Sequence, residues 1–156
     1  MMYLHDLDTG ASDKQVYNDF YTGLFHDLPE VLTKDVITPI KTNVNGLAAI
    51  LEEYERDLVE SRIMPLLREE WREEFALMVY DPFADIDVDG FGARNGYDLK
   101  ACDHLAAYME AFISRRYGIT SNTLLEGERS IRDKLVEKGS GINAKNLLED
   151  FDRMRI

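Results

Sequence analysis

The sequence predicts an all-α protein, and two observations carry this prediction. Apolar residues recur at intervals of three and four through almost the whole chain, while the strict alternation of a half-buried strand is scarce. Capping and stop signals divide this pattern into segments of helical length. A chain of 156 residues, 45% of them hydrophobic, suffices for one substantial core but not for two ordinary domains, so we expect a single domain over residues 1–156.

The first half of the chain contains several helix boundaries. Ser12 with Gln15 has the form of a capping box, which predicts a helix that starts there and ends near Pro29. A short helical segment is expected to follow to about Val36. Thr38-Pro39 should end it, because the residue before a proline is pushed out of the α region.

The remaining predicted helices are bounded by proline and glycine. Pro65 separates the first two, which we expect to be core helices because each carries one amphipathic apolar stripe. Gly118 and Gly139 are stop signals for two of the later helices. The predicted spans are 47–58, 66–78, 98–117, 123–137 and 143–154. Residues 81–96 are rich in Gly and Asp and are predicted to form a surface loop.

The first residues have the character of a helix end. Met1 to Leu4 are apolar and stop before Asp8-Thr9-Gly10, with too few residues ahead of them for a stable helix of ordinary length. We therefore expect the chain to begin inside an element, with its N-terminal part incomplete.

Composition excludes several classes of partner. The formal net charge of −12 opposes binding to a nucleic-acid polymer or an anionic membrane, although a small anionic substrate fits if a bound cation reverses the field locally. No apolar run of membrane-spanning length and no secretory signal is present in the sequence, so we expect a cytoplasmic protein. The single Cys102 cannot form an intrachain disulfide and is expected to be buried filler.

An acidic stretch in the predicted loop opens like a calcium-binding loop. Asp85, Asp87 and Asp89 have the required spacing, but the eighth and twelfth positions, which need an apolar residue and a bidentate Glu, hold Gly92 and Gly96. Without the closing carboxylate, an acidic surface turn is the better interpretation.

His-Asp pairs occur more than once, so the dipeptide alone proves little. His5-Asp6 has no further partner nearby in the sequence, and we expect no site there. His104 follows Asp103 within a helix, where neighbouring side chains point about 100° apart, so we interpret His104 as an ordinary polar residue near the helix surface.

The pair of His26 and Asp27 differs because it falls where a helix ends. Local geometry there can direct an imidazole and a carboxylate at one ion, and Glu30 and Asp35 are close enough in sequence to line the same cavity. Asp103 is the distant candidate, because a carboxylate bordering an apolar helix face is costly unless it is paired, hydrogen-bonded or bound to a metal. The residues by themselves leave two alternatives, a metal site or a set of salt bridges and caps.

Two strings together resemble a known family. HDLPEVLTKDVITPIK, residues 26–41, resembles the central motif of the HD-domain metal-dependent phosphohydrolases, in the branch of the bacterial 5′-deoxynucleotidases. KACDHLAAY, residues 100–108, resembles that branch's second motif, in which an Asp opens a stretch of the form D-x-L-x-A-Y. The similarity runs from about Ser12 to Arg132.

The resemblance implies an all-α HD-domain helical bundle that removes phosphate from (deoxy)nucleoside 5′-monophosphates. It implies that His26, Asp27 and Asp103 bind a divalent ion, that Glu30 handles the attacking water, and that Asp35 contacts the substrate and assists catalysis. Mn²⁺, Co²⁺, Fe²⁺, Zn²⁺ and Mg²⁺ all fit such ligands. A nucleotide or related phosphoester is the implied partner, and a homodimer the implied assembly.

One expected feature is missing from the sequence. The family's first metal-binding His lies in an upstream helix within a motif resembling E-H-S, and nothing of that form occurs here; His5 sits where the end of that helix should be. Two alternatives therefore stay beside the main prediction. The chain could act on another phosphoester or a nucleoside triphosphate, or it could be a catalytically inactive helical module that binds a nucleotide or a partner.

Overall fold

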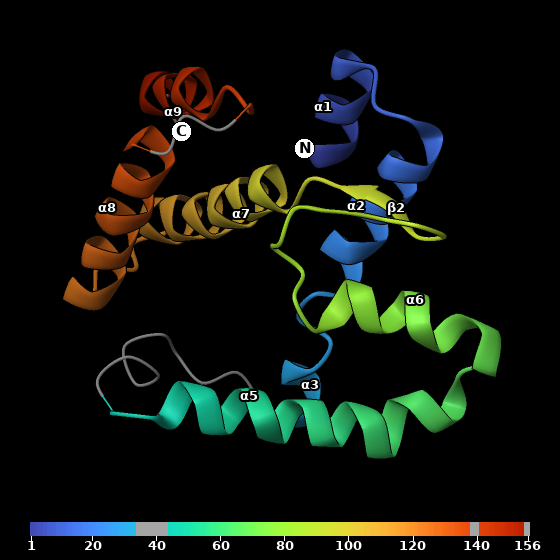
Figure 1. Ribbon diagram of the computed structural model, residues 1–156. Helices are drawn as coiled ribbons and strands as arrows, with labels where there is room; N and C mark the ends of the chain where they lie inside the picture. Colours follow the sequence, from blue (N-terminus) through green and yellow to red (C-terminus); the bar gives the residue numbers. More distant parts are fainter. Residues whose placement is uncertain (34–43, 138–140, 155–156) are drawn as a thin grey trace. The chain divides into compact units, whose positions relative to one another are not determined.

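The structure is a computed structural model that describes residues 1–33, 44–137 and 141–154 (Figure 1). Most of these residues are helical, and a two-stranded hairpin is the sheet among them, which confirms the all-α class. The chain forms two compact units, one made of Met1–Asp19 with Phe83–Ile156 and the other of Phe20–Pro82. The prediction of a single domain stays a prediction.

The first unit opens with two helices that follow the sequence signals. Helix α1 (Met2–Thr9) ends at Gly10, whose φ of 72° is the left-handed conformation that favours glycine at a helix C-terminus. Helix α2 (Asp13–Phe25) starts at the predicted cap, where the backbone N–H of Gln15 donates to Ser12 Oγ at 3.2 Å. Its last residues, from Phe20, belong to the second unit.

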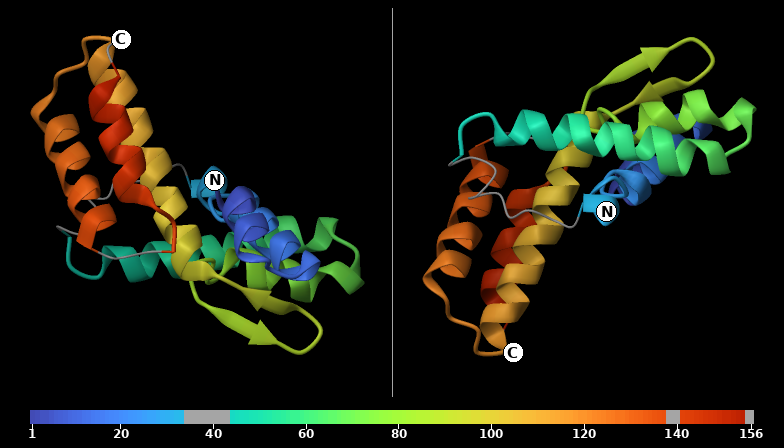
Figure 2. Two further views of the ribbon diagram at one scale, coloured as in Figure 1. Left: turned by 90° about the horizontal axis from the view of Figure 1, so that it is seen from above. Right: turned by 90° about the horizontal axis from the view of Figure 1, so that it is seen from below.

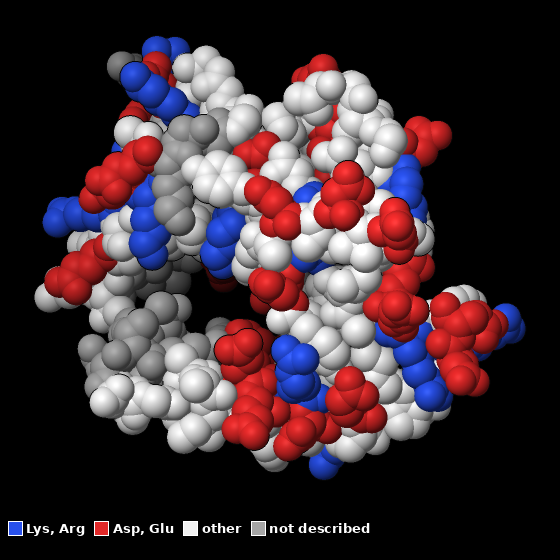
Figure 3. All heavy atoms as spheres, viewed as in Figure 1, with Lys and Arg blue, Asp and Glu red and all other residues white. Residues whose placement is uncertain are grey.

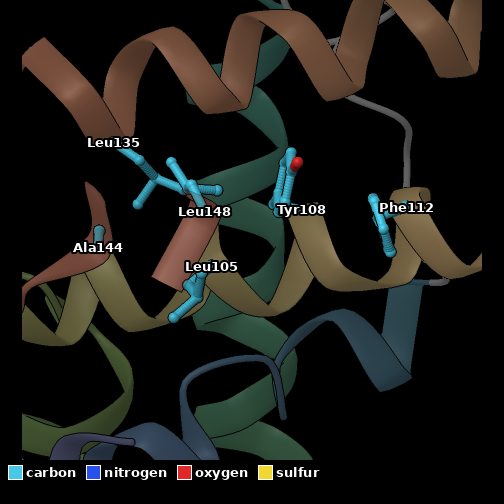
Figure 4. Packing of buried hydrophobic residues seen from close by; sticks show 6 residues of the cluster. All are labelled: Leu105, Tyr108, Phe112, Leu135, Ala144 and Leu148. Carbon is cyan, nitrogen blue, oxygen red and sulfur yellow. The ribbon is translucent and has the colours of Figure 1, made fainter. Parts of the chain in front are cut away.

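Three further helices form the apolar core of the first unit. They are α7 (Gly96–Arg116), α8 (Asn122–Glu137) and α9 (Ala144–Arg153), close to their predicted spans. Both further views show α8 and α9 lying alongside α7 (Figure 2). The buried side chains that join them come from all three helices (Figure 4): Leu105, Tyr108, Phe112, Leu135, Ala144 and Leu148.

Buried polar side chains fix the start of α7. Asp98 is 5% exposed, and its carboxylate accepts hydrogen bonds from the Asn95 amide (2.8 Å) and the Gly141 N–H (2.9 Å) and lies 3.1 Å from His5 Nε2. Asp19, fully buried on α2, accepts the Asn95 N–H at 2.9 Å. The first turn of α7 is thereby tied to α1, to α2 and to the segment before α9.

The prediction that residues 81–96 form a surface loop is wrong in part, because they include two short strands. Strand β1 (Ile86–Val88) pairs antiparallel with strand β2 (Gly92–Arg94), and Ile86 lies opposite Arg94. Residues 89–91 form the turn, and Gly90 within it has a φ of 85° that an L residue rarely adopts. The hairpin forms because a short turn containing Asp-Gly follows a segment with Ile and Val. The buried Asn18 amide stabilises it by donating to Phe91 O (2.8 Å) and Ala93 O (2.9 Å).

The second unit contains the helices on both sides of Pro65. Helix α5 (Leu47–Leu58) is followed by a π-helical turn (Val59–Ile63) and a 3-10 turn (Met64–Leu66), and α6 (Glu69–Val79) then begins. The predicted interruption at Pro65 is therefore confirmed, because a proline is tolerated in the first turn of a new segment but not inside a helix.

The expectation that these two helices are core helices is wrong for part of the apolar stripe. Ile50, Tyr54 and Trp71 are 64%, 54% and 51% exposed, and burial concentrates at Leu58, Val59, Met78 and Val79, where α5 ends and α6 ends. The helical period of a sequence shows that a face is apolar, but only packing partners decide whether that face is covered.

The buried Asp19 should make stability depend on pH. Burial raises the pKa of its carboxyl to about 6, and the nearby Asp6 carboxylate adds to this rise, while the Asn95 N–H opposes it. Because the folded state then binds the proton more tightly than the unfolded state, this group stabilises the fold below pH 4 and the contribution is lost as the pH rises toward 6. We expect Asp19→Asn, which keeps an acceptor for Asn95, to be more stable than wild type by about 2 kcal/mol at pH 7.

Urea unfolding between pH 4 and pH 7.5 measures this effect. The stability difference between Asp19→Asn and wild type should shrink as the pH falls, whereas Asp13→Asn, an exposed change in the first turn of the same helix, should show no such trend. A pH-independent difference for Asp19→Asn would show that its carboxyl has an ordinary pKa.

Candidate functional site

The predicted His-Asp pair lies in the turn directly after α2. The helix ends at Phe25, and the His26 N–H still donates to Thr22 O at 2.9 Å, as in a last helical bond. Pro29 cannot donate a backbone hydrogen bond, and the chain instead turns and starts α3 (Glu30–Thr33). His26 and Asp27 therefore leave the helical spacing that would otherwise point adjacent side chains apart.

One backbone contact sets the chemistry of the His26 ring. His26 Nδ1 lies 2.8 Å from the carbonyl oxygen of Gly23, which can only accept a hydrogen bond. Nδ1 therefore carries a proton, and in the neutral ring Nε2 holds the lone pair. This is the arrangement by which a carbonyl orients a metal-binding imidazole in many proteins.

The lone-pair nitrogen faces a carboxylate. His26 Nε2 lies 3.2 Å from Asp27 Oδ2; the His26 side chain is 17% exposed and that of Asp27 is 71% exposed. Two acceptor atoms at this separation repel unless a proton or a cation is shared between them. The pair can thus either bind a proton, as an imidazolium-carboxylate ion pair, or supply two ligands to one metal ion.

Glu30 and Asp35 are the predicted acidic neighbours of this pair. Glu30 is half-buried and opens α3, and its N–H donates to Asp27 O at 3.1 Å, so the backbone turn brings it next to the pair along the chain. Asp35 lies outside the described residues, as does the predicted break at Thr38-Pro39.

Asp103 lies in the middle of α7, in the first unit. Its carboxylate, 31% exposed, accepts a hydrogen bond from Lys100 Nζ at 2.8 Å, one turn earlier on the helix. Lys100 is a contact that the motifs alone do not indicate, although a Lys three residues before an acidic residue on one helix is a recognisable signal for an ion pair.

The structure brings some of the predicted site residues into contact with one another, but not all of them. His26 and Asp27 are in contact, and Glu30 follows them in the same unit. Among the described residues, no three His, Cys, Asp or Glu side chains gather as a metal-binding group. The assignment of His26, Asp27 and Asp103 to one ion therefore stays a prediction.

The other candidates have structural roles. His5 contacts the buried Asp98, a partner that is distant in sequence and that the sequence analysis missed. Asp85 accepts the Tyr97 N–H at 2.9 Å beside the start of α7, as a surface turn would. Burial raises the pKa of the Cys102 thiol to about 11, so this residue is not a ready nucleophile.

The helical fold, with a His-Asp pair directly after a helix, agrees with the all-α class of HD-domain proteins. More narrowly, the model of the 5′-deoxynucleotidase YfbR-like family matches residues 9–142, and the chain belongs to that family. The family resemblance noted in the sequence is thereby confirmed.

Two relatives are named after this activity. A 5′-deoxynucleotidase of Shewanella oneidensis is 24% identical over 128 residues, which make up 82% of this chain and 60% of that protein. A 5′-deoxynucleotidase of Photobacterium profundum is 33% identical over 90 residues, 56% of this chain and 41% of that protein. The chain thus spans 60% or less of the length of these relatives. No solved structure matches the chain.

A helix that spans a membrane is both long and almost wholly apolar, which the described helices are not. None of those in residues 1–33, 44–137 and 141–154 combines the length and the apolar character needed to cross a bilayer.

The contact with Gly23 predicts the tautomer of His26. At a pH well above neutral, where imidazole is uncharged, we expect the His26 proton on Nδ1. Long-range ¹H–¹⁵N correlation spectra distinguish the two ring nitrogens, and the signals that disappear in a His26→Ala variant assign those of His26. A protonated Nε2 would show that His26 does not present a lone pair toward Asp27.

Proposed function

We propose that this protein is a metal-dependent phosphohydrolase that removes phosphate from deoxynucleoside 5′-monophosphates. One observation from the structure supports this most directly: the Gly23 carbonyl orients His26 so that Nε2 and Asp27 Oδ2 form a pair of ligands 3.2 Å apart. The family and the names of the relatives support the nucleotide substrate.

The residue types fit a divalent ion. An imidazole nitrogen and carboxylate oxygens are ligands for Mn²⁺, Co²⁺, Fe²⁺, Zn²⁺ and Mg²⁺, and His26, Asp27 and Asp103 would hold the ion. When bound, such an ion lowers the pKa of a water molecule and stabilises negative charge on a phosphate oxygen.

The charge of the protein also favours a cation at the site. The chain has a formal net charge of −12, and Asp and Glu side chains gather over α5 and α6 (Figure 3). A phosphate dianion approaching such a surface meets repulsion unless a positive charge is fixed at the binding site.

The remaining acidic residues supply proton transfer and substrate contact. In the proposed reaction, water attacks phosphorus, the bond between phosphorus and the 5′ oxygen breaks, and a nucleoside and inorganic phosphate are formed. Glu30 accepts the proton of the attacking water, and Asp35 contacts the sugar end and assists the leaving oxygen.

A non-catalytic nucleotide- or partner-binding module is the second candidate. The small number of histidines favours it: the chain has three His, and His5, which precedes His26, contacts Asp98. The ligand set within the chain then comprises one imidazole and two carboxylates. Metal analysis of the purified chain separates the candidates, because a stoichiometric ion supports the enzyme and a site that stays empty at saturating metal supports the module.

Removal of either proposed carboxylate ligand tests the main proposal. With Mn²⁺ or Co²⁺ present, we expect phosphate release from deoxynucleoside 5′-monophosphates, and Asp27→Ala and Asp103→Ala should each lower it by roughly 100-fold or more. Asp57→Ala on α5 and Asp133→Ala on α8, both exposed, serve as controls and should act like wild type. Normal turnover by a folded Asp27→Ala or Asp103→Ala variant would refute the proposal.

A substrate panel tests the substrate class in the same assay. Ribonucleotides, nucleoside triphosphates and a simple aryl phosphate replace the deoxynucleotide in turn. Faster hydrolysis of a triphosphate or of the aryl phosphate would favour the alternative that the chain acts on another phosphoester.

The Glu30→Gln variant separates proton transfer from metal binding. Because an amide cannot accept the proton of water, we expect kcat to fall by about 10²–10⁴, while the affinity for the metal stays close to that of wild type. A fall in kcat accompanied by an equally large fall in metal affinity would instead indicate that Glu30 is a metal ligand. Steady-state kinetics at saturating metal, together with equilibrium dialysis, provide both readouts.

The assembly and location are proposals of the same kind. We infer a homodimer from the family resemblance, and a cytoplasmic location from the lack of an apolar run of membrane-spanning length and from the single cysteine. Light scattering and cell fractionation check them.

A further inference from the structure

The side chain of Lys100 is held on two sides. Its Nζ donates to Asp103 Oδ2 at 2.8 Å, and the same nitrogen lies 3.9 Å from the centroid of the Phe83 ring. Lys100 is 39% exposed and Asp103 is 31% exposed. A solvent-exposed ion pair contributes little by itself, so the ring contact is what distinguishes this pair from an ordinary surface pair.

Phe83 is held in position by the start of α7. The Ala84 carbonyl accepts hydrogen bonds from Arg94 Nε (3.1 Å) and Nη2 (3.0 Å), and Arg94 is 3% exposed. Gly96 packs so closely against this segment that a Cβ there would lie 2.4 Å from the Phe83 carbonyl carbon and from Ala84 O. The backbone that carries Phe83 is therefore packed directly on the first turn of α7.

The helical repeat then brings Lys100 onto the same side. Lys100 follows Gly96 by four residues and precedes Asp103 by three, so the three positions lie along one face of α7. The ammonium group is confined between an aromatic ring and a carboxylate, both supplied by the first unit. The ring contact and the ion pair together restrict the positions that this ammonium group adopts.

We propose that Lys100 is a positioning residue for Asp103 in metal binding. The ammonium group binds Oδ2 and restricts the rotation of the carboxylate that would hold the metal ion. A ligand that is already oriented loses less conformational entropy when the ion binds. Partners that hydrogen-bond a metal-binding carboxylate commonly improve metal affinity in this way.

Repulsion between Lys100 and the ion acts in the opposite direction. A bound ion would be repelled by the ammonium group, and the exposure of Lys100 lets solvent screen this repulsion. The orienting effect should therefore be larger, and the sign of the change in metal affinity tests this directly.

This inference rests on the proposed function, since it needs a metal ion at Asp103. Equilibrium dialysis of the intact chain with Mn²⁺ gives the dissociation constant without any assay of activity. We expect Lys100→Met to weaken Mn²⁺ binding by about 10–100-fold. Lys100→Arg keeps a charged donor and should stay within about threefold of wild type. Lys134→Met, an exposed change on α8, is the matched control and should bind like wild type.

Kinetics at saturating Mn²⁺ separate positioning from direct substrate binding. If Lys100 acts only through Asp103, kcat and KM of Lys100→Met should both return to wild-type values once the metal site is filled. A KM that stays raised at saturating metal would assign Lys100 to the phosphate and overturn the positioning role.

The outcomes distinguish this inference from the proposed function. Wild-type protein that binds no Mn²⁺ overturns both. Wild-type protein that binds Mn²⁺ and hydrolyses the nucleotide, beside a Lys100→Met variant of equal or tighter affinity, overturns the positioning role alone. Circular dichroism melts of each variant confirm that the change in affinity is measured on folded protein.

Discussion

The buried carboxylate of Asp98 is the constraint on which the first unit depends. It bonds to the Asn95 side chain and to the Gly141 N–H and contacts His5, while Asp19 holds the Asn95 backbone. Removing such a group from water is costly unless its oxygens are paired, so the segments that supply the partners must come together when the unit folds. The start of α7 is fixed by this requirement, and Lys100 and Asp103 follow in the next two turns.

The candidate functional residues of the second unit, His26 and Asp27, lie directly after the end of helix α2. Where α2 stops, carbonyl groups of its last turn have no helical partner, and the Gly23 carbonyl binds the His26 ring instead. An ordinary consequence of helix termination thus selects the imidazole tautomer. The same termination places Asp27 next to Nε2, which a continuous helix would not allow.

Some site residues could be predicted from the sequence because their signal is local. His26, Asp27 and Glu30 lie within a few residues of a helix end marked by Pro29, and Asp103 is a candidate because it borders an apolar helix face and opens a second motif. Lys100 was missed although its spacing to Asp103 is helical, because the contact that distinguishes it comes from Phe83, which is 17 positions away in the printed sequence. His5 was set aside because its partner Asp98 is 93 positions away.

The sequence by itself determined the helices, their approximate ends and the family, because caps, prolines, apolar periodicity and short motifs act over a few residues. Only the tertiary structure decided that residues 86–94 form a hairpin held by Asn18, that Ile50 and Tyr54 in the apolar stripe of α5 are exposed, and that Lys100 contacts both Asp103 and Phe83. These features depend on contacts between segments far apart in the chain. Such contacts are set by packing and by the pairing of buried polar groups, and neither can be read from local spacing.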